Sequence, residues 1–217
     1  FSDITRLLIS VGGVAVAIIL IIVLLGIYGG SSDQMSAYIN STAADLWVAQ
    51  SGSPDMLHSS TIIPASLATE FAGVDGVSAV HPLNSRTTLV EKDGVKSSLI
   101  VQGFEPADGV GGPWNMAEGR GDPAPGEIVL DQVTMDKNGL TIGGDIDIDG
   151  QIHRIVGVSR DTSLLVAQYA FVNIAETRRV LGPDRVNFLM LQVDDSARVD
   201  EVRQEIAGRH PELAVYT

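Results

Sequence analysis

The sequence predicts an α+β protein that begins with a transmembrane helix and continues as a domain of strands and helices. Three observations lead to this prediction. Leu7–Tyr28 holds no charged, amide or proline residue. Two later stretches, on either side of residues 85–185, share the order strand, helix, strand. Between them lie short strands and glycine-rich turns, which are typical of a small β-rich insertion.

The apolar stretch Leu7–Tyr28 is long enough to cross a bilayer. As a helix, its residues would extend roughly 33 Å, close to the ~30 Å hydrocarbon core. It lacks the polar face that a soluble helix shows at 3.6-residue spacing. A cleaved signal peptide is the alternative, but its apolar core is only about 7–15 residues and ends in an A-x-A-like site. Here GGSSDQ follows the run. Residues 1–30 are therefore predicted to be a transmembrane helix.

Charges beside this stretch predict its orientation. Arg6 precedes it, the first charged residue after it is Asp33, and the next basic residue is Arg86. Positive charge is retained on the cytoplasmic side of membranes. We therefore expect a protein of the cell membrane whose N-terminus is cytoplasmic and whose residues after about 30 are extracytoplasmic.

The spacing of Met35, Tyr38 and Ile39 predicts that the membrane helix continues outward as a stalk. The pair Gly29-Gly30 weighs against an unbroken helix, because glycine lowers helix stability. The stalk is thus one of two possibilities at this point.

Composition limits the partners. The formal net charge is −13 and the pI is near 4.5, which argues against nucleic acid and against an anionic membrane surface. Cysteine is absent, so the chain has neither disulfides nor thiolate metal sites. About 187 residues follow residue 30, enough for one well-buried domain or two small ones.

Residues 31–84 and 186–217 are expected to form the two halves of one subdomain. Each half reads as strand, helix, strand, and two such units describe a ferredoxin-like sheet covered by two helices. The expected elements are a strand at Asp45–Gln50, a turn at Ser51–Asp55, a helix at Pro64–Phe71, a strand at Val77–Leu83 with Pro82 at its end or at an edge, a strand at Val186–Val193, a helix capped by Ser196 and stopped by Gly208, and a strand at Glu212–Thr217.

Residues 85–185 are expected to form an inserted, β-rich subdomain. The dipeptides Asp93-Gly94 and Asp149-Gly150 are strong hairpin signals. The expected elements are strands at Arg86–Val90, Ser97–Phe104, Glu127–Asp131, Asp145–Asp149, His153–Val158 and Ala170–Asn173, a loop at Glu105–Gly126, and a helix at Ile174–Leu181.

The sequence contains no convincing active site. Asp145–Gly150 matches the opening of a calcium-binding loop, but position twelve is Val156 where glutamate is needed, and the alternation also fits a half-buried strand. The histidines, His58, His81, His153 and His210, lack metal-ligand spacing. Nucleophile-elbow and Walker A motifs are absent. Trp47 and Trp114 are expected to anchor the core or a loop, and the glycine-rich Gly109–Trp114 precedes no phosphate-binding helix. We therefore predict no catalytic, cofactor-binding or metal residues.

Several motifs, in order, resemble the MacB/LolC/FtsX-like permeases of ABC transporters. Arg6–Ala15 looks like the first membrane helix of these permeases with its preceding arginine. The ordered landmarks of their periplasmic core domain resemble Glu118–Arg120, Gly126–Leu130, Gly139–Asp145 and Ile155–Val158. In that family a porter subdomain of two β-α-β halves is interrupted by a second subdomain, which is similar to the division described above.

The resemblance implies a permease subunit that is not an enzyme. It implies four membrane helices, of which this chain would hold the first, and ATP hydrolysis by a cytoplasmic partner that moves the outer domain for export or signalling. The implied partners are that ATPase, a second permease copy in a homo- or heterodimer, membrane lipid and an extracytoplasmic protein. The alternative is a single-span membrane-anchored binding or sensor module without a transport role. An enzyme is a third and weaker possibility, because no acid–base or nucleophile constellation is present.

Overall fold

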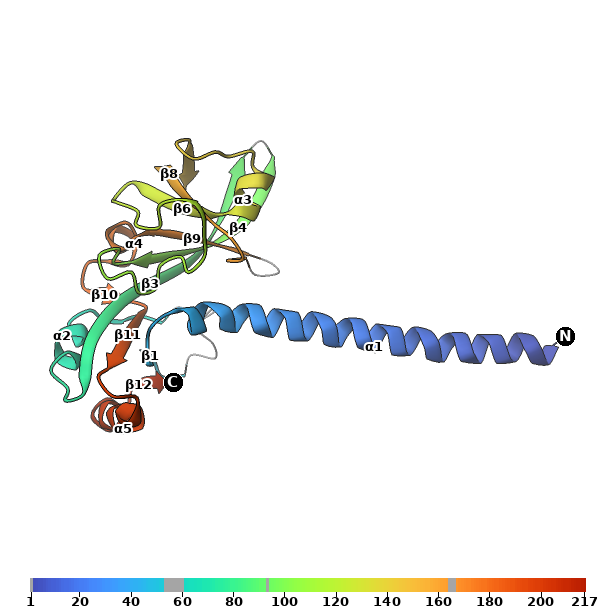
Figure 1. Cartoon of the computed structure of the whole chain (residues 1–217), viewed down its shortest axis with the longest axis horizontal. Helices are drawn as coiled ribbons and strands as arrows, with labels where there is room; N and C mark the ends of the chain where they lie inside the picture. Colours follow the sequence, from blue (N-terminus) through green and yellow to red (C-terminus); the bar gives the residue numbers. More distant parts are fainter. Residues whose placement is uncertain (1, 53–60, 93, 164–166) are drawn as a thin grey trace. The chain divides into compact units, whose positions relative to one another are not determined.

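The computed structural model describes residues 2–52, 61–92, 94–163 and 167–217 (Figure 1). The chain divides into two compact units, Phe1–Tyr38 and Ile39–Thr217. Helix α1 (Ser2–Ser41) forms the first unit, and its last turn belongs to the second. Part of the predicted turn at Ser51–Asp55 lies outside the described residues.

Helix α1 is continuous from Ser2 to Ser41 and includes the glycine pair Gly29-Gly30. The helical extension past Tyr28 is thus confirmed. The large apolar side chains between Val11 and Leu25 are 51–65% exposed. Within the part of the chain that the structure describes, no helix has both the length and the apolar character required of a membrane span.

The second unit is built on one ten-stranded mixed sheet with the strand order β12-β1-β11-β3-β4-β9-β6-β8-β5, and β7 pairs with β8. A separate two-stranded ladder joins β2 to β10. The strands are β1 (Leu46–Gln50), β2 (Ile63–Pro64), β3 (Val77–Lys92), β4 (Val95–Phe104), β5 (Met116–Gly119), β6 (Glu127–Asp131), β7 (Asp145–Ile148), β8 (Gln151–Ser159), β9 (Gln168–Asn173), β10 (Arg185–Val186), β11 (Phe188–Val193) and β12 (Leu213–Tyr216). The helices are α2 (Leu67–Phe71), α3 (Gln132–Lys137), α4 (Ile174–Leu181), the 3₁₀ turn η1 (Ser196–Arg198) and α5 (Val199–Arg209).

One end of the sheet consists of β12, β1, β11 and β3, which pair antiparallel. This order is that of two interlocked β-α-β units. Their core takes Leu46 and Val48 from β1, Leu67 and Phe71 from α2, Leu189 and Leu191 from β11, and Val202 and Ile206 from α5. Because α2 and α5 share this core, they cover the same face of these strands.

The other end of the sheet has a core of its own. It is formed by buried side chains of β4, β6, β8 and β9, including Leu99, Val101, Ile128, Leu130, Ile155, Ala170 and Val172. This core has no residue in common with the first. Residues Val77–Leu83 of β3 pair with β11, and residues Asn84–Lys92 pair with β4. One long strand, visible in Figure 1, therefore belongs to both ends of the sheet.

Several predicted strands and turns are confirmed. Asp149 (φ 54°) and Gly150 (φ 79°) form the tight hairpin turn between β7 and β8, where both left-handed conformations fit a type I′ turn. Helix α4 has the predicted bounds. The predicted end of the strand at Leu83 is wrong, because β3 continues to Lys92; Pro82 lies inside it, in the part that pairs with β11.

The predicted start of the second helix is wrong. Pro64 belongs to β2, where it pairs with Arg185, and α2 begins only at Leu67. Ala65 donates its N–H to the Asp184 carbonyl at 2.9 Å, which keeps the chain extended past the proline.

The predicted last helix has the wrong cap and the wrong stop. Asp195, not Ser196, accepts the capping hydrogen bond from the Ala197 N–H, at 2.9 Å. The helix continues through Gly208 to Arg209, because a glycine in ordinary helical conformation weakens a helix without ending it.

The single strand predicted at Val186–Val193 is interrupted at Asn187, and the predicted loop at Glu105–Gly126 contains strand β5. Helix α3 was not predicted. Its N-cap, Asp131, is the last residue of a correctly predicted strand and accepts from the Val133 N–H at 2.8 Å.

Two glycines in the landmark motifs lie where backbones approach closely. Gly119 of β5 pairs with Gly157 of β8. A Cβ atom on Gly157 would overlap the Arg120 carbonyl oxygen, and one on Gly119 would overlap the Val156 carbonyl oxygen. Glycine at both positions is therefore a packing requirement.

We predict that Gly157→Ala lowers the free energy of unfolding by about 1–3 kcal/mol, the usual cost of overpacking. The matched control is Gly208→Ala, since nothing lies within 4 Å of a Cβ built there. That exposed helical site should gain about 0.5–1 kcal/mol. Denaturant unfolding of both variants measures the difference, and equal stability of the two would contradict the close approach.

Candidate functional site

A buried polar junction lies where the chain passes between the two cores. Asn84 of β3 and Asn187, between β10 and β11, are 1% and 6% exposed. The Ser85 N–H donates to Asn187 Oδ1 at 2.9 Å, and the Asn187 N–H donates to Asn84 Oδ1 at 3.2 Å. Each asparagine side chain thus accepts a hydrogen bond from a backbone N–H of the other segment.

Two further elements are attached to this junction. Asn187 Nδ2 donates to the Thr61 carbonyl at 2.6 Å, and the Thr61 hydroxyl donates to the Asn187 carbonyl. Asn84 Nδ2 donates to Thr177 Oγ1 of α4 at 3.0 Å. The junction therefore fixes both crossing points of the chain to α4.

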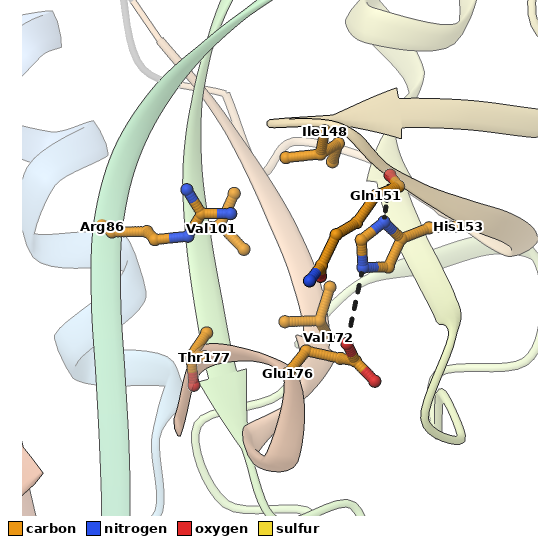
Figure 2. Close-up of a pocket in the computed structure, with 8 residues that line it drawn as sticks. All are labelled: Arg86, Val101, Ile148, Gln151, His153, Val172, Glu176 and Thr177. Carbon is orange, nitrogen blue, oxygen red and sulfur yellow. Dashed lines mark hydrogen bonds and ion pairs between the residues drawn. The ribbon is translucent and has the colours of Figure 1, made fainter. Parts of the chain in front are cut away.

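A small pocket lies beside this junction (Figure 2). Its cavity of about 10 Å³ has room for about one water molecule. Its lining residues come from β3, β4, β7, β8, β9 and α4: Arg86, Val101, Ile148, Gln151, His153, Val172, Glu176 and Thr177.

His153 and Glu176 face each other in this pocket, as Figure 2 shows, and both are nearly fully buried. His153 Nε2 lies 4.0 Å from Glu176 Oε2, and His153 Nδ1 donates to the Gln151 carbonyl at 3.0 Å. Glu176 also accepts from the Gly126 N–H and from Arg179 Nη1, each at 3.0 Å. The buried carboxylate is therefore held by a helix, a strand and a loop.

The aspartates of the possible calcium loop lie on strand β7 and its turn. Ile146 and Ile148 are 4% and 2% exposed, while Asp145 and Asp147 face solvent, so the half-buried strand is confirmed. Asp149 accepts from Arg86 and from the Thr88 hydroxyl, and these two hydrogen bonds lower the pKa of its carboxyl. Asp149 thus ties the hairpin turn to β3.

The described histidines each have their own, separate partners. His58 lies outside the described residues. His81 contacts Asp108 and Gln192, His153 lies in the pocket, and His210 contacts Glu70 and Glu212. Among the described residues, no group of three or more potential ligands is placed to hold a metal ion.

The two tryptophans have packing roles, as expected. Trp47 is 2% exposed and lies edge-on to Phe188. Trp114 lies edge-on to Tyr169 and Phe171 of β9, at centroid distances of 5.7 and 6.0 Å. Burial raises the pKa of the Tyr169 phenol.

This arrangement stabilises a junction and offers no room for a transported molecule. Sequence reasoning missed Asn84, Asn187 and Glu176. The available signal was a polar residue inside an apolar run, which Asn187 provides between Val186 and Phe188. Its partners could not be foreseen, since Asn84 lies 103 positions away.

Comparison with known proteins agrees with this fold. The family model of the MacB-like periplasmic core domain matches residues 7–209. The periplasmic region of MacB from Actinobacillus actinomycetemcomitans has a similar structure, with a TM-score of 0.58 and 14% identity, over 82% of this chain and 91% of that chain. The extracellular domain of the noncanonic ABC-type transporter YknZ from Gram-positive bacteria is also similar, with a TM-score of 0.58 and 12% identity, over 79% of this chain and 98% of that one. Comparison with curated protein sequences gives no match.

The fold and the family model together define a periplasmic or extracellular domain of a membrane transporter. The chain belongs to the MacB-like periplasmic core domain family, and its predicted resemblance to MacB/FtsX-like ABC transporter permeases is confirmed.

One histidine gives a prediction for stability against pH. His210 Nε2 lies 2.8 Å from Glu70 Oε1, and Nδ1 lies 3.0 Å from Glu212 Oε1. These hydrogen bonds, that to Glu212 first, raise the pKa of His210. Because the pKa of His210 is higher in the folded state, its protonation stabilises the fold. This contribution is complete below the pKa of the unfolded state, about 6.5, and is lost as the pH rises through the pKa of the folded state.

His210→Gln should therefore remove part of the decrease in unfolding free energy between about pH 6.5 and about pH 8.5. Denaturant unfolding across this range measures it. Arg203→Gln is the control, because it removes an exposed ion pair to Asp200 of the same helix and leaves the contacts of His210 in place. If the unfolding free energy of His210→Gln changed with pH as steeply as that of the native protein, the contacts of His210 would contribute nothing to the pH dependence.

Proposed function

We propose that this chain is the N-terminal portion of a permease subunit of a MacB/FtsX-type ABC transporter. In this role it couples ATP hydrolysis by a cytoplasmic partner to movement of its extracytoplasmic domain, for export or for signalling. The family match carries this proposal, since residues 7–209 include both the apolar stretch and the domain. The pocket supports a mechanical role over a catalytic one, because it holds about one water molecule.

The membrane anchor belongs to this proposal. Residues 1–30 form the transmembrane helix, with Arg6 on the cytoplasmic side and the residues after about 30 outside. Support comes from the uncharged stretch Leu7–Tyr28 and from the helical conformation of Ser2–Ser41. Membrane lipid, a cytoplasmic ATPase, a second permease copy and an extracytoplasmic protein are the proposed partners.

We also propose the division into a porter subdomain, 31–84 with 186–217, and an inserted subdomain, 85–185. Two separate hydrophobic cores support it, as does the change of partner of β3 between Leu83 and Asn84. The paired asparagines at the two crossing points are consistent with a seam between subdomains.

The proposed topology can be tested because the chain has no native cysteine. Val180 of α4 is 65% exposed, so a Val180→Cys variant should react with an impermeant thiol reagent on intact cells. Ser2→Cys, on the proposed cytoplasmic side, is the control and should react only after lysis. The reverse labelling pattern would refute the proposed orientation.

Coupling can be tested at the end of α1. Inserting about eight Gly/Ser residues after Asn40 of the full-length permease converts a stiff helical connection into a random coil. Insertion in the membrane and ATPase binding should be unchanged, and ATP turnover should persist while transport or activation of the outer partner falls sharply.

Both activities must be measured on the same preparation, because lost expression would imitate lost coupling. An insertion of equal length at Gly94, in the β3–β4 hairpin turn, is a suitable control. Full coupled activity after insertion at Asn40 would favour the alternative, a membrane-anchored binding or sensor module.

A further inference from the structure

We propose that His81, Asp108 and Gln192 form a protonation-dependent latch, which holds the exit of helix α1 on strand β11 and links it to the loop of residues 105–115. The latch is a chain of side-chain contacts within the second unit. Its effect on transport rests on the proposed function, whereas its chemistry does not.

The exit segment, residues 42–45, is attached to β11 at successive points. The Ala43 carbonyl accepts from Gln192 Nε2 at 2.9 Å. Asp45 donates its N–H to the Leu191 carbonyl at 2.9 Å and accepts from the Val193 N–H at 2.8 Å. At its other end, Thr42 donates its hydroxyl to the Ile39 carbonyl of α1 at 2.8 Å. The last turn of α1 is therefore connected to β11 through a short, hydrogen-bonded segment.

His81 lies behind Gln192 and is 8% exposed. Its Nε2 is 3.3 Å from Gln192 Oε1, and its Nδ1 is 3.0 Å from Asp108 Oδ2. Gln192 uses its amide nitrogen for Ala43, so its amide oxygen faces the imidazole. Both ring nitrogens therefore face acceptors.

A neutral imidazole has a single N–H and can donate to only one of these acceptors, while the imidazolium donates to both. The Asp108 carboxylate is a stronger acceptor than the Gln192 amide oxygen, so the neutral ring keeps its proton on Nδ1 and presents the Nε2 lone pair to Gln192 Oε1. Turning the Gln192 amide would relieve that repulsion, but it would place the amide oxygen against the Ala43 carbonyl. Loss of the proton therefore weakens the hold on residue 43 whichever way Gln192 turns.

The charged and polar groups that face His81 come from three elements. Asp108 contacts the ring from the loop of residues 105–115. From the exit segment, Asp45 faces β11, where its carboxylate accepts from the Val193 N–H. From β11, the neighbours Met190 and Gln192 are uncharged. The Asp108 side chain is 40% exposed, so protons of the surrounding medium can reach the pair.

The loop that supplies Asp108 is anchored to aromatic side chains of β4 and β9. Gly112 lies against the Phe104 ring, where a Cβ would be only 2.6 Å from a ring carbon. Trp114 packs on Tyr169 and Phe171. The latch therefore joins three parts: the exit of α1, strand β11, and a loop that packs on β4 and β9.

Hydrogen–deuterium exchange of the full chain in detergent micelles tests the latch directly. Exchange is followed at about pH 5.5 and about pH 8, on either side of the ordinary histidine titration, and is corrected for intrinsic amide exchange. In the native chain, the amides of residues 42–46 should lose protection about tenfold at the higher pH, the size of one charge-assisted hydrogen bond.

Three variants separate the latch from general effects. Asp108→Asn, in an accessible loop, should show the low protection of residues 42–46 already at the lower pH. His81→Gln should remove the pH dependence. The third variant, His210→Gln, removes a histidine that also has two hydrogen-bond partners, Glu70 and Glu212. It should leave the pH dependence of residues 42–46 unchanged.

A pH dependence that persists in His81→Gln, or is absent from the native chain, would overturn the latch. So would equal loss of the dependence in His210→Gln. If the exchange results are as expected but the native permease shows no pH-dependent coupling, the latch stands and the proposed transport role of the segment fails.

Discussion

The structure depends on one constraint: strand β3 must pair with different neighbouring strands in the two parts of its length. Its first part pairs with β11 and its second with β4, so the backbone has to change partner between Leu83 and Asn84. At such a point, ladder hydrogen bonds cannot satisfy every buried N–H and C=O group. Asn84 and Asn187 satisfy them reciprocally with their side chains. Leaving such groups unpaired would cost about 1–3 kcal/mol each, which is comparable to a large fraction of the stability of a domain.

The same constraint explains one group of buried polar side chains. Four of them lie at the seam and are hydrogen-bonded to one another there: Thr61, Asn84, Thr177 and Asn187. A seam made only of apolar contacts would not specify its register, whereas hydrogen bonds between particular atoms do. The glycines of the landmark motifs are required for a different reason. Gly119 and Gly157 allow β5 and β8 to approach more closely than any side chain permits.

Local signals in the sequence predicted much of the fold and little of the site. Alternation and turn dipeptides located β6, β7, β8 and α4, because these elements are decided within a few residues. Prediction failed where a distant partner decides the local structure. Pro64 is extended because the Asp184 carbonyl accepts from the backbone N–H of the next residue, Ala65. The strand break at Asn187 depends on hydrogen bonds to Asn84 and Thr61. The division into subdomains and the membrane span remain predictions, and the resemblance to the permease family is the inference that the comparisons confirmed.

The connections of β11 indicate how a displacement at the end of α1 would travel. Residues 42–45 are bonded to Leu191, Gln192 and Val193, near the end of a strand that pairs with β1 on one side and with β3 on the other. A pull on this segment would reach the first core through the backbone N–H of Asp45 and through the side chains of Asp45 and Gln192. Because β3 continues into the second part of the sheet, the same strand would carry the displacement across the seam, past Asn84.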